Sequence, residues 1–438
     1  MTIKTKSCLS PGLLIGSLLF STSVIAEFDF RAETKLNYRH SEANAFPTAF
    51  PFPPIALPVG ETRASLETVE AGSHAEVSNI ALFLDWYISD NWAVKSKVDL
   101  IDLYERNPTS SDQEVSLDQF IIRYGQKHTQ GLLPRAATGY MQIGKFGKLE
   151  RQEDRHLESY GLSSTAFNRV EDSGIEWGVD FTNGLYGKLS YTTGNPVFMR
   201  DTNALAGDNG IDRTPPPNPD PEIKTGIPIL YDAEVETFNL SDTPETGVAL
   251  GYRWLNDDGS NRINVMLFGY ERELAETQEL HGTFYGGDLD ILDLTEVIPD
   301  VRLPITNKDK KEFGINFWWY TSRASVFFQA ISQNLAGLER DGSELELSYA
   351  LINSTIGLGI TQVSPVIRYS IMDNHFVGNS IFPSPSFWWD WEKLDVGINT
   401  DFGENFRLTL EYALNKFERR EKIEANNEFL LTLRWRFN

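Results

Sequence analysis

The residues best suited to do chemistry in this chain are charged, and many of them lie in one segment. Residues 147–172 contain several acids mixed with arginines and a histidine. Carboxylates and guanidinium groups mixed in this way can bind ions and set the electric field in a narrow aqueous passage. Composition alone is equally typical of a solvated surface loop of mixed charge. The candidate constriction residues are Glu150, Arg151, Glu153, Asp154, Arg155 and Glu158.

A second set of charged residues, all basic, follows a period of two along the chain. Because a strand places successive side chains on opposite faces, residues two apart share a face. In lipid such groups would each cost about 2 to 4 kcal/mol at the midplane, so this face is predicted to meet water. An acidic loop opposite this basic wall would create a transverse field that orients polar solutes, whereas the alternative is a set of salt bridges that stiffens the structure. The wall consists of Arg31, Lys95, Lys97, Arg123, Arg253, Arg368, Arg407, Arg434 and Arg436.

The elements that carry these residues are predicted strands. At the C-terminus Phe429, Leu431, Leu433, Trp435 and Phe437 share one face, and the polar residues between them share the other. Segments with the same alternation recur along the chain, and a helical period is not sustained. The predicted strands are about 10 to 15 residues long, as a tilted membrane strand requires, whereas strands of soluble sandwiches usually have nearer 5 or 6.

Aromatic side chains gather near the ends of the predicted strands. Trp86 with Tyr87, residues 317–320, and Trp435 with Phe437 are examples. Aromatic residues at strand ends are typical of the two interfaces of a membrane barrel. This clustering and the strand length favour a membrane barrel over a soluble sandwich.

The connections between the predicted strands alternate between short and longer. Seven short and eight longer connections give about sixteen strands, with a range of 14 to 18. The predicted fold is all-β, a transmembrane antiparallel up-and-down β-barrel with short periplasmic turns and long extracellular loops. A barrel of this size leaves an aqueous channel. The short connections are 89–91, 126–135, 182–184, 256–261, 321–323, 353–357 and 401–405, and the longer or more polar ones are 40–73, 105–113, 147–172, 194–243, 273–308, 332–341, 372–385 and 416–425.

The first 26 residues have the order of a secretory signal peptide. Lys4 and Lys6 precede an apolar run, and small residues follow it. Residues 27–438 would then form one barrel domain, and loss of the two lysines would change the net charge from −23 to −25. Such acidity argues against nucleic acid as a partner. The single cysteine, Cys8, lies in the signal, and the six histidines are scattered, so no metal site and no cofactor are expected.

Two short segments carry a resemblance to a known family. Residues 143–151, with the sequence IGKFGKLER, and residues 169–178, with Trp177, are similar to the region after the fifth strand of phosphate-selective and related substrate-preferring porins. The chain thus resembles the Gram-negative outer-membrane porin superfamily. This resemblance implies that loop 147–172 folds into the pore and that the chain forms a homotrimer.

These observations predict a non-enzymatic protein of the cell outer membrane. The expected function is passive diffusion of small polar solutes or ions through a water-filled pore, with the lipid bilayer and lipopolysaccharide as partners. One alternative is a channel specific for an oligosaccharide, an organic acid or an anionic polymer. An outer-membrane hydrolase, which would need a filled lumen, and a structural or adhesive barrel without conductance are further alternatives.

Overall fold

The computed structural model describes most of the predicted barrel. The described residues are 27–42, 45–47, 65–67, 72–102, 115–126, 133–152, 154–163, 167, 171–194, 229–230, 244–256, 258–273, 279–281, 287–288, 307, 309–335, 337–353, 359–375, 390–419 and 422–437. The expected signal peptide, residues 1–26, lies outside them. Within these ranges, no helix has the length and apolar character needed to cross a membrane.

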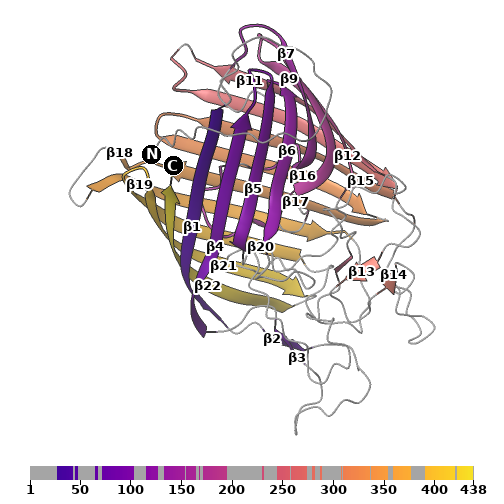
Figure 1. The fold of residues 1–438 in the computed structure, drawn as a ribbon. Helices are drawn as coiled ribbons and strands as arrows, with labels where there is room; N and C mark the ends of the chain where they lie inside the picture. The colour runs from indigo at the N-terminus through magenta and orange to yellow at the C-terminus, as the bar shows by residue number, and fades with distance from the viewer. Residues whose placement is uncertain are drawn as a thin grey trace, which may run out of the picture.

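The chain forms a closed antiparallel barrel of 16 strands, as the alternation predicts (Figure 1). Each strand pairs with the next one along the chain, and the last strand pairs with the first, with Lys35 opposite Arg434. The strands are β1 (Glu27–Ser41), β4 (Gly72–Tyr87), β5 (Trp92–Asp102), β6 (Ser116–Gly125), β7 (Thr138–Gly147), β8 (Glu171–Asp180), β9 (Leu185–Thr192), β11 (Glu245–Leu255), β12 (Arg262–Glu273), β15 (Asp309–Tyr320), β16 (Ala324–Leu335), β17 (Leu338–Tyr349), β19 (Ile360–Asn374), β20 (Asp390–Phe402), β21 (Phe406–Arg419) and β22 (Lys422–Phe437).

Short strands extend this framework. β18 (Ile352–Asn353) pairs with β19 at the edge of the barrel. Two small sheets, β2 (Ala45–Pro47) with β3 (Ser65–Glu67), and β10 (Ile229–Leu230) with β13 (Glu279–His281) and β14 (Gly287–Asp288), lie beyond the barrel wall (Figure 1).

All fifteen predicted connections fall between barrel strands. β1 begins and β22 ends at the end of the barrel where the short connections lie. Two connections predicted to be longer or more polar, 332–341 and 416–425, are polar but are tight hairpins, because β16, β17, β21 and β22 continue into these residues. Polar strand ends are compatible with a ladder that continues into water beyond the membrane.

The two faces of each strand differ in the way the alternation predicts. On β17, Leu345, Leu347 and Tyr349 are exposed outward, whereas Glu344 and Glu346 are buried inward. A closed barrel satisfies all backbone hydrogen bonds within the wall, so an apolar exterior of this kind can lie in lipid. The polar face is thereby turned to the lumen.

Aromatic side chains form contacts at the end of the barrel that carries the short turns. Trp92 and Tyr124 have ring centroids 5.0 Å apart, and Phe406 stacks on Trp435 at 5.4 Å. These rings are amphipathic or lie beside polar turns, as in the aromatic belt of a membrane interface. They mark one boundary of the membrane-spanning zone.

The interior holds an apolar cluster as well as charged groups. We define the apolar cluster as the buried residues Leu149, Leu162, Phe167, Tyr186, Ala249, Met266, Phe268, Tyr270, Trp318, Phe327, Ile331, Met372 and Trp391. Three of them, Leu149, Leu162 and Phe167, come from the connection between β7 and β8, and the others come from the wall. This connection therefore packs against the inner wall.

Candidate functional site

The site is built by the connection between β7 and β8, which we call the lumen loop, residues 148–170. Its first residues bind the inner faces of β12 and β15. The backbone N–H of Leu149 donates to the Tyr270 hydroxyl at 2.9 Å, and Asn316 Nδ2 donates to the Glu150 carbonyl at 2.7 Å. These bonds satisfy backbone groups that leave the sheet after β7, as buried polar groups require.

Ionic contacts and hydrogen bonds fix the loop where it leaves the wall and where it returns. The Lys148 ammonium donates to Glu245 on β11, and the Arg151 guanidinium pairs with Glu171 at the start of β8. The pKa of the Lys148 ammonium is raised, since the carboxylates around it outweigh the opposing effect of its burial. At the return, Asp172 Oδ1 accepts hydrogen bonds from the backbone N–H groups of Ser173 and Gly194, at 2.8 and 3.1 Å.

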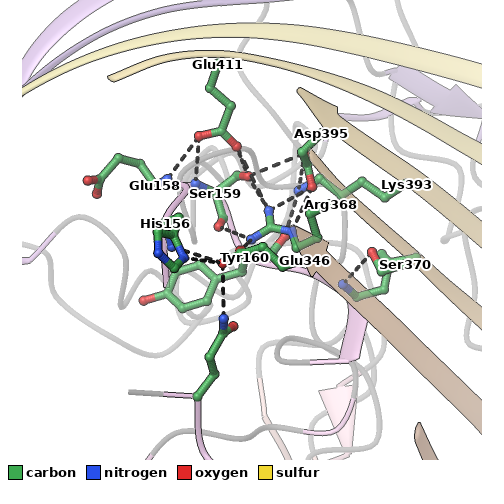
Figure 2. A network of polar contacts seen from close by, with 12 residues as sticks. His156, Glu158, Ser159, Tyr160, Glu346, Arg368, Ser370, Lys393, Asp395 and Glu411 are labelled. Atoms are coloured by element: carbon green, nitrogen blue, oxygen red, sulfur yellow. Dashed lines mark hydrogen bonds and ion pairs between the residues drawn. The ribbon is translucent and has the colours of Figure 1, made fainter. Parts of the chain in front are cut away.

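The middle of the loop binds a buried charged network on the opposite strands (Figure 2). Arg368 on β19 donates through Nε and Nη2 to Asp395 Oδ2, at 3.0 and 2.7 Å. The same guanidinium donates to the carbonyl of Ser159 at 3.0 Å and to its Oγ. Arg368 is fully buried, so its charge depends on these partners for compensation.

Glu411 on β21 binds the loop from the other side of Arg368. Its Oε2 accepts from the backbone N–H groups of Glu158 and Ser159, at 3.0 and 3.3 Å, and the Ser159 hydroxyl donates to Oε1. Lys393 on β20 donates to the carbonyl of Tyr160 at 2.7 Å. Figure 2 shows these side chains converging on the loop from three neighbouring strands. We call Glu346, Arg368, Lys393, Asp395 and Glu411, with the loop atoms that they bind, the charged network.

Small residues let the loop approach the wall closely. On β17, a side chain at Gly342 would collide with the ring of Phe167. On β20, a Cβ at Gly397 would lie 2.6 Å from Leu157 Cδ2, and in the loop a Cβ at Gly161 would collide with the Glu344 carboxylate. The loop position therefore depends on glycines whose partners are distant in sequence.

The predicted constriction residues have different surroundings. Glu150 is buried with the Tyr270 hydroxyl donating to it, and Arg151 is half-buried beside Glu171. Asp154 is exposed, and the Arg155 guanidinium lies 3.7 Å from the Tyr160 ring centroid. Glu153 lies outside the described residues.

Glu158 joins the loop to the first strand. Lys35 Nζ donates to Glu158 Oε2 at 2.9 Å, and both side chains are largely buried. Burial alone would raise the pKa of the Glu158 carboxyl, but Lys35, Arg155 and Arg434 outweigh it and lower the pKa to about 2. The carboxylate is therefore ionised at neutral pH and holds the loop to β1.

The predicted basic wall is divided between two environments. Arg253, which pairs with Asp180, and Arg368 are buried inside the barrel. The others lie on β1, β5, β6, β21 and β22, which the structure brings together in one part of the wall, with β4 between β1 and β5. Their ion pairs are Arg31 with Asp29 and Asp85, Lys95 with Asp85, Lys97 with Asp99 and Asp118, Arg407 with Asp401, and Arg434 and Arg436 with Glu33. Arg123 has no acidic partner among the residues that the structure describes.

Several residues that hold the loop were not singled out from the sequence. Lys35 shares the inward face of β1 with Arg31, so the period of two could have identified it. Ser159, Lys393, Asp395 and Glu411 gave no such signal, because their partners lie far away along the chain. In the described ranges, no group of three potential ligands is arranged to hold a metal ion.

No family model matches the sequence, and no curated protein matches it. Solved structures with the same fold do match it over nearly its full length. The outer membrane channel DcaP of Acinetobacter baumannii has a TM-score of 0.50 at 9% identity, and covers 95% of this chain and 99% of its own. OprB of Pseudomonas putida has a TM-score of 0.51 at 10% identity, with 94% of each chain covered.

The chain has the fold of these outer-membrane β-barrels. A third match, OmpT, an outer membrane protein of Vibrio cholerae, has a TM-score of 0.49 at 10% identity, and covers 96% of this chain and all of its own. With its apolar exterior and closed wall, the barrel belongs in the lipid of the cell outer membrane.

Proposed function

We propose that this chain is a porin through which small hydrophilic solutes diffuse across the outer membrane. The observation that carries the proposal is the set of charged, partly exposed side chains on the inner wall, such as Arg31, Lys95 and Lys97. Unlike Arg368, these groups are not enclosed by the loop and can be solvated in an open lumen. The lumen loop narrows that lumen from the opposite side and sets its cross-section.

Conductance in a planar bilayer tests this proposal. We expect the purified barrel to give stepwise, ohmic currents in KCl, because a water-filled pore conducts without a gating step. A variant in which a short Gly-Ser linker replaces residues 154–162 should give larger steps, since the loop no longer occupies the lumen. Circular dichroism of the variant provides the control for an intact barrel. Absence of any current from the folded wild type would contradict the proposal.

A substrate-specific channel is the second candidate function. The resemblance of residues 143–151 and 169–178 to phosphate-selective and substrate-preferring porins favours it. Such a channel would show saturable block of the current by its substrate at low concentration, whereas a diffusion pore would not.

Two further expectations belong to the same proposal. We propose that the protein is not an enzyme, and an assay for phospholipid and peptide hydrolysis by the purified barrel tests this point. We also propose a homotrimer, which light scattering of the detergent-solubilised protein would distinguish from a monomer.

A further inference from the structure

We propose that the pore prefers small anions, although the whole chain has a net charge of −23. This inference rests on the proposed diffusion function and concerns which charges of the inner wall face the solute. The two members of each ion pair differ in exposure, and a solute meets only the group that reaches the lumen.

The pair between β1 and β4 shows the arrangement. Arg31 Nη2 lies 3.2 Å from Asp85 Oδ2, and the exposed fractions of the two side chains are 44% and 8%. Lys95 Nζ lies 3.2 Å from the same carboxylate and is likewise the more exposed partner. The carboxylate of Asp85 is therefore covered, whereas its two cationic partners, Arg31 and Lys95, are accessible.

Neighbouring strands repeat this asymmetry. Lys97 is 22% exposed, whereas its partner Asp99 is fully covered. At the turn end, Arg436 is 53% exposed, and Glu33, 2.5 Å away, is 10% exposed. Long basic side chains can lie over the wall and present their charge to water, while a short carboxylate remains near the backbone.

The lumen loop shows the same difference between acids and bases. Arg151 is 28% exposed, whereas its partner Glu171 is 7% exposed. His156 is likewise more exposed than its partner Glu346, and Glu150 and Glu158 are buried. Of the three loop acids that the structure describes, Glu150 and Glu158 are therefore withdrawn from the lumen, and Asp154 is exposed.

Three wall acids depart from the pattern, and one pair reverses it, since Arg39 is 2% exposed and its partner Glu76 is 19% exposed. Asp29 is as exposed as Arg31, and Asp401 is only slightly more covered than Arg407. Arg123 adds basic charge to the same wall, because it has no acidic partner among the described residues. The accessible surface of this wall is therefore more basic than acidic.

The accessible charge determines selectivity because electrostatic interactions in water act over short distances. Opposite charges in contact attract by about 1 kcal/mol in bulk water, and salt screens the interaction over about 10 Å. An anion that passes the wall can touch Arg31 or Arg436 directly, whereas a cation meets Asp85 or Glu33 only behind them. Low-dielectric walls strengthen this preference by focusing the field in the pore.

The reversal potential under a KCl gradient tests the sign of the selectivity. We expect the wild type to pass chloride in preference to potassium. In the variant with Arg31→Gln, Lys95→Gln and Arg436→Gln, the ratio of chloride to potassium permeability should fall on the order of two- to five-fold. Lys311→Gln is the matched control, because Lys311 is an exposed cation on the outward face of β15 and its loss should leave the ratio unchanged.

A second pair of variants separates exposure from net charge. If exposure decides, Lys95→Gln should lower the permeability ratio more than Asp85→Asn raises it, although both remove one charge of the same ion pair. Equal and opposite changes would overturn the exposure argument. A wild-type pore that prefers potassium would overturn the anion preference and leave the diffusion function intact, whereas a folded barrel without current would contradict the diffusion function itself.

Discussion

The apolar cluster and the charged network hold the same loop against the barrel by different physical means. In the apolar cluster, Leu149, Leu162 and Phe167 of the loop pack among side chains such as Phe268 and Ile331. These contacts are non-directional, and the loss of one methyl group changes the burial by a small amount. The cluster should therefore respond to substitution in a graded way.

The charged network depends on complete sets of partners. Arg368, Asp395 and Glu411 are buried, and each of them forms a hydrogen bond with Ser159. Removal of one member leaves the others as uncompensated charges in a region of low dielectric. The network therefore fixes the loop position more specifically, and it should tolerate substitution less well.

The largest expected effect is the loss of the central guanidinium. Arg368→Gln should lower the free energy of unfolding by about 3 to 5 kcal/mol, the usual cost of breaking a buried ion pair. It should also release the loop, because the bonds to the Ser159 carbonyl and hydroxyl are lost. Thermal denaturation followed by circular dichroism measures the first effect, and single-channel conductance measures the second.

The triple variant Arg368→Gln, Asp395→Asn and Glu411→Gln is the control for this prediction. It removes two of the carboxylates that Arg368 compensates and should recover part of the lost stability without restoring the loop position. If Arg368→Gln were as stable as the wild type, the network would contribute no more to stability than the apolar contacts.

A smaller effect is expected in the apolar cluster. Ile331→Val removes one methylene group from a buried side chain and should cost about 0.5 to 1.5 kcal/mol. The matched control is Ile315→Val on the outward face of the adjacent strand β15, where lipid can fill the space. The two melting temperatures, compared with that of the wild type, test the prediction. If Ile331→Val lowered the free energy of unfolding as much as Arg368→Gln, the distinction between the two regions would be removed.

The effect confined to the narrowest range of conditions is the pH dependence of the bond between Glu158 and Lys35. The pKa of the Glu158 carboxyl falls from an ordinary value of 4.5 to about 2 in the folded protein. Its contribution to stability is therefore complete above about pH 4.5 and is lost as the pH falls through about 2. The difference in melting temperature between wild type and Glu158→Gln should be constant near neutral pH and should shrink in this acidic window.

Glu271→Gln is the control for the pH series, because Glu271 is an exposed acid on β12. The melting temperature of this variant should differ little from that of the wild type at every pH. If the difference for Glu158→Gln persists down to pH 2, the carboxylate does not hold the loop through its charge.

Local pattern determined the barrel. The period of two placed Leu345 and Leu347 outward and Glu346 inward, because lipid and water impose opposite requirements on the two faces of one strand. The strand number and the closure of β1 on β22 followed from the alternation and the spacing of turns. The inward direction of the basic side chains could be predicted for the same reason, since each of these residues is assigned to a face by its immediate neighbours.

Tertiary structure alone decided what these charged residues touch. Ser159 meets Arg368 across 209 positions of sequence, and the fit of Leu157 depends on the missing side chain at Gly397. Whether the acid or the base of an ion pair reaches the lumen also depends on how the wall and the loop cover it. The sequence by itself determined the two faces of each strand, because a strand's pleat is local. The partners across the lumen were set only by the folded barrel, because closure brings residues together regardless of their separation along the chain.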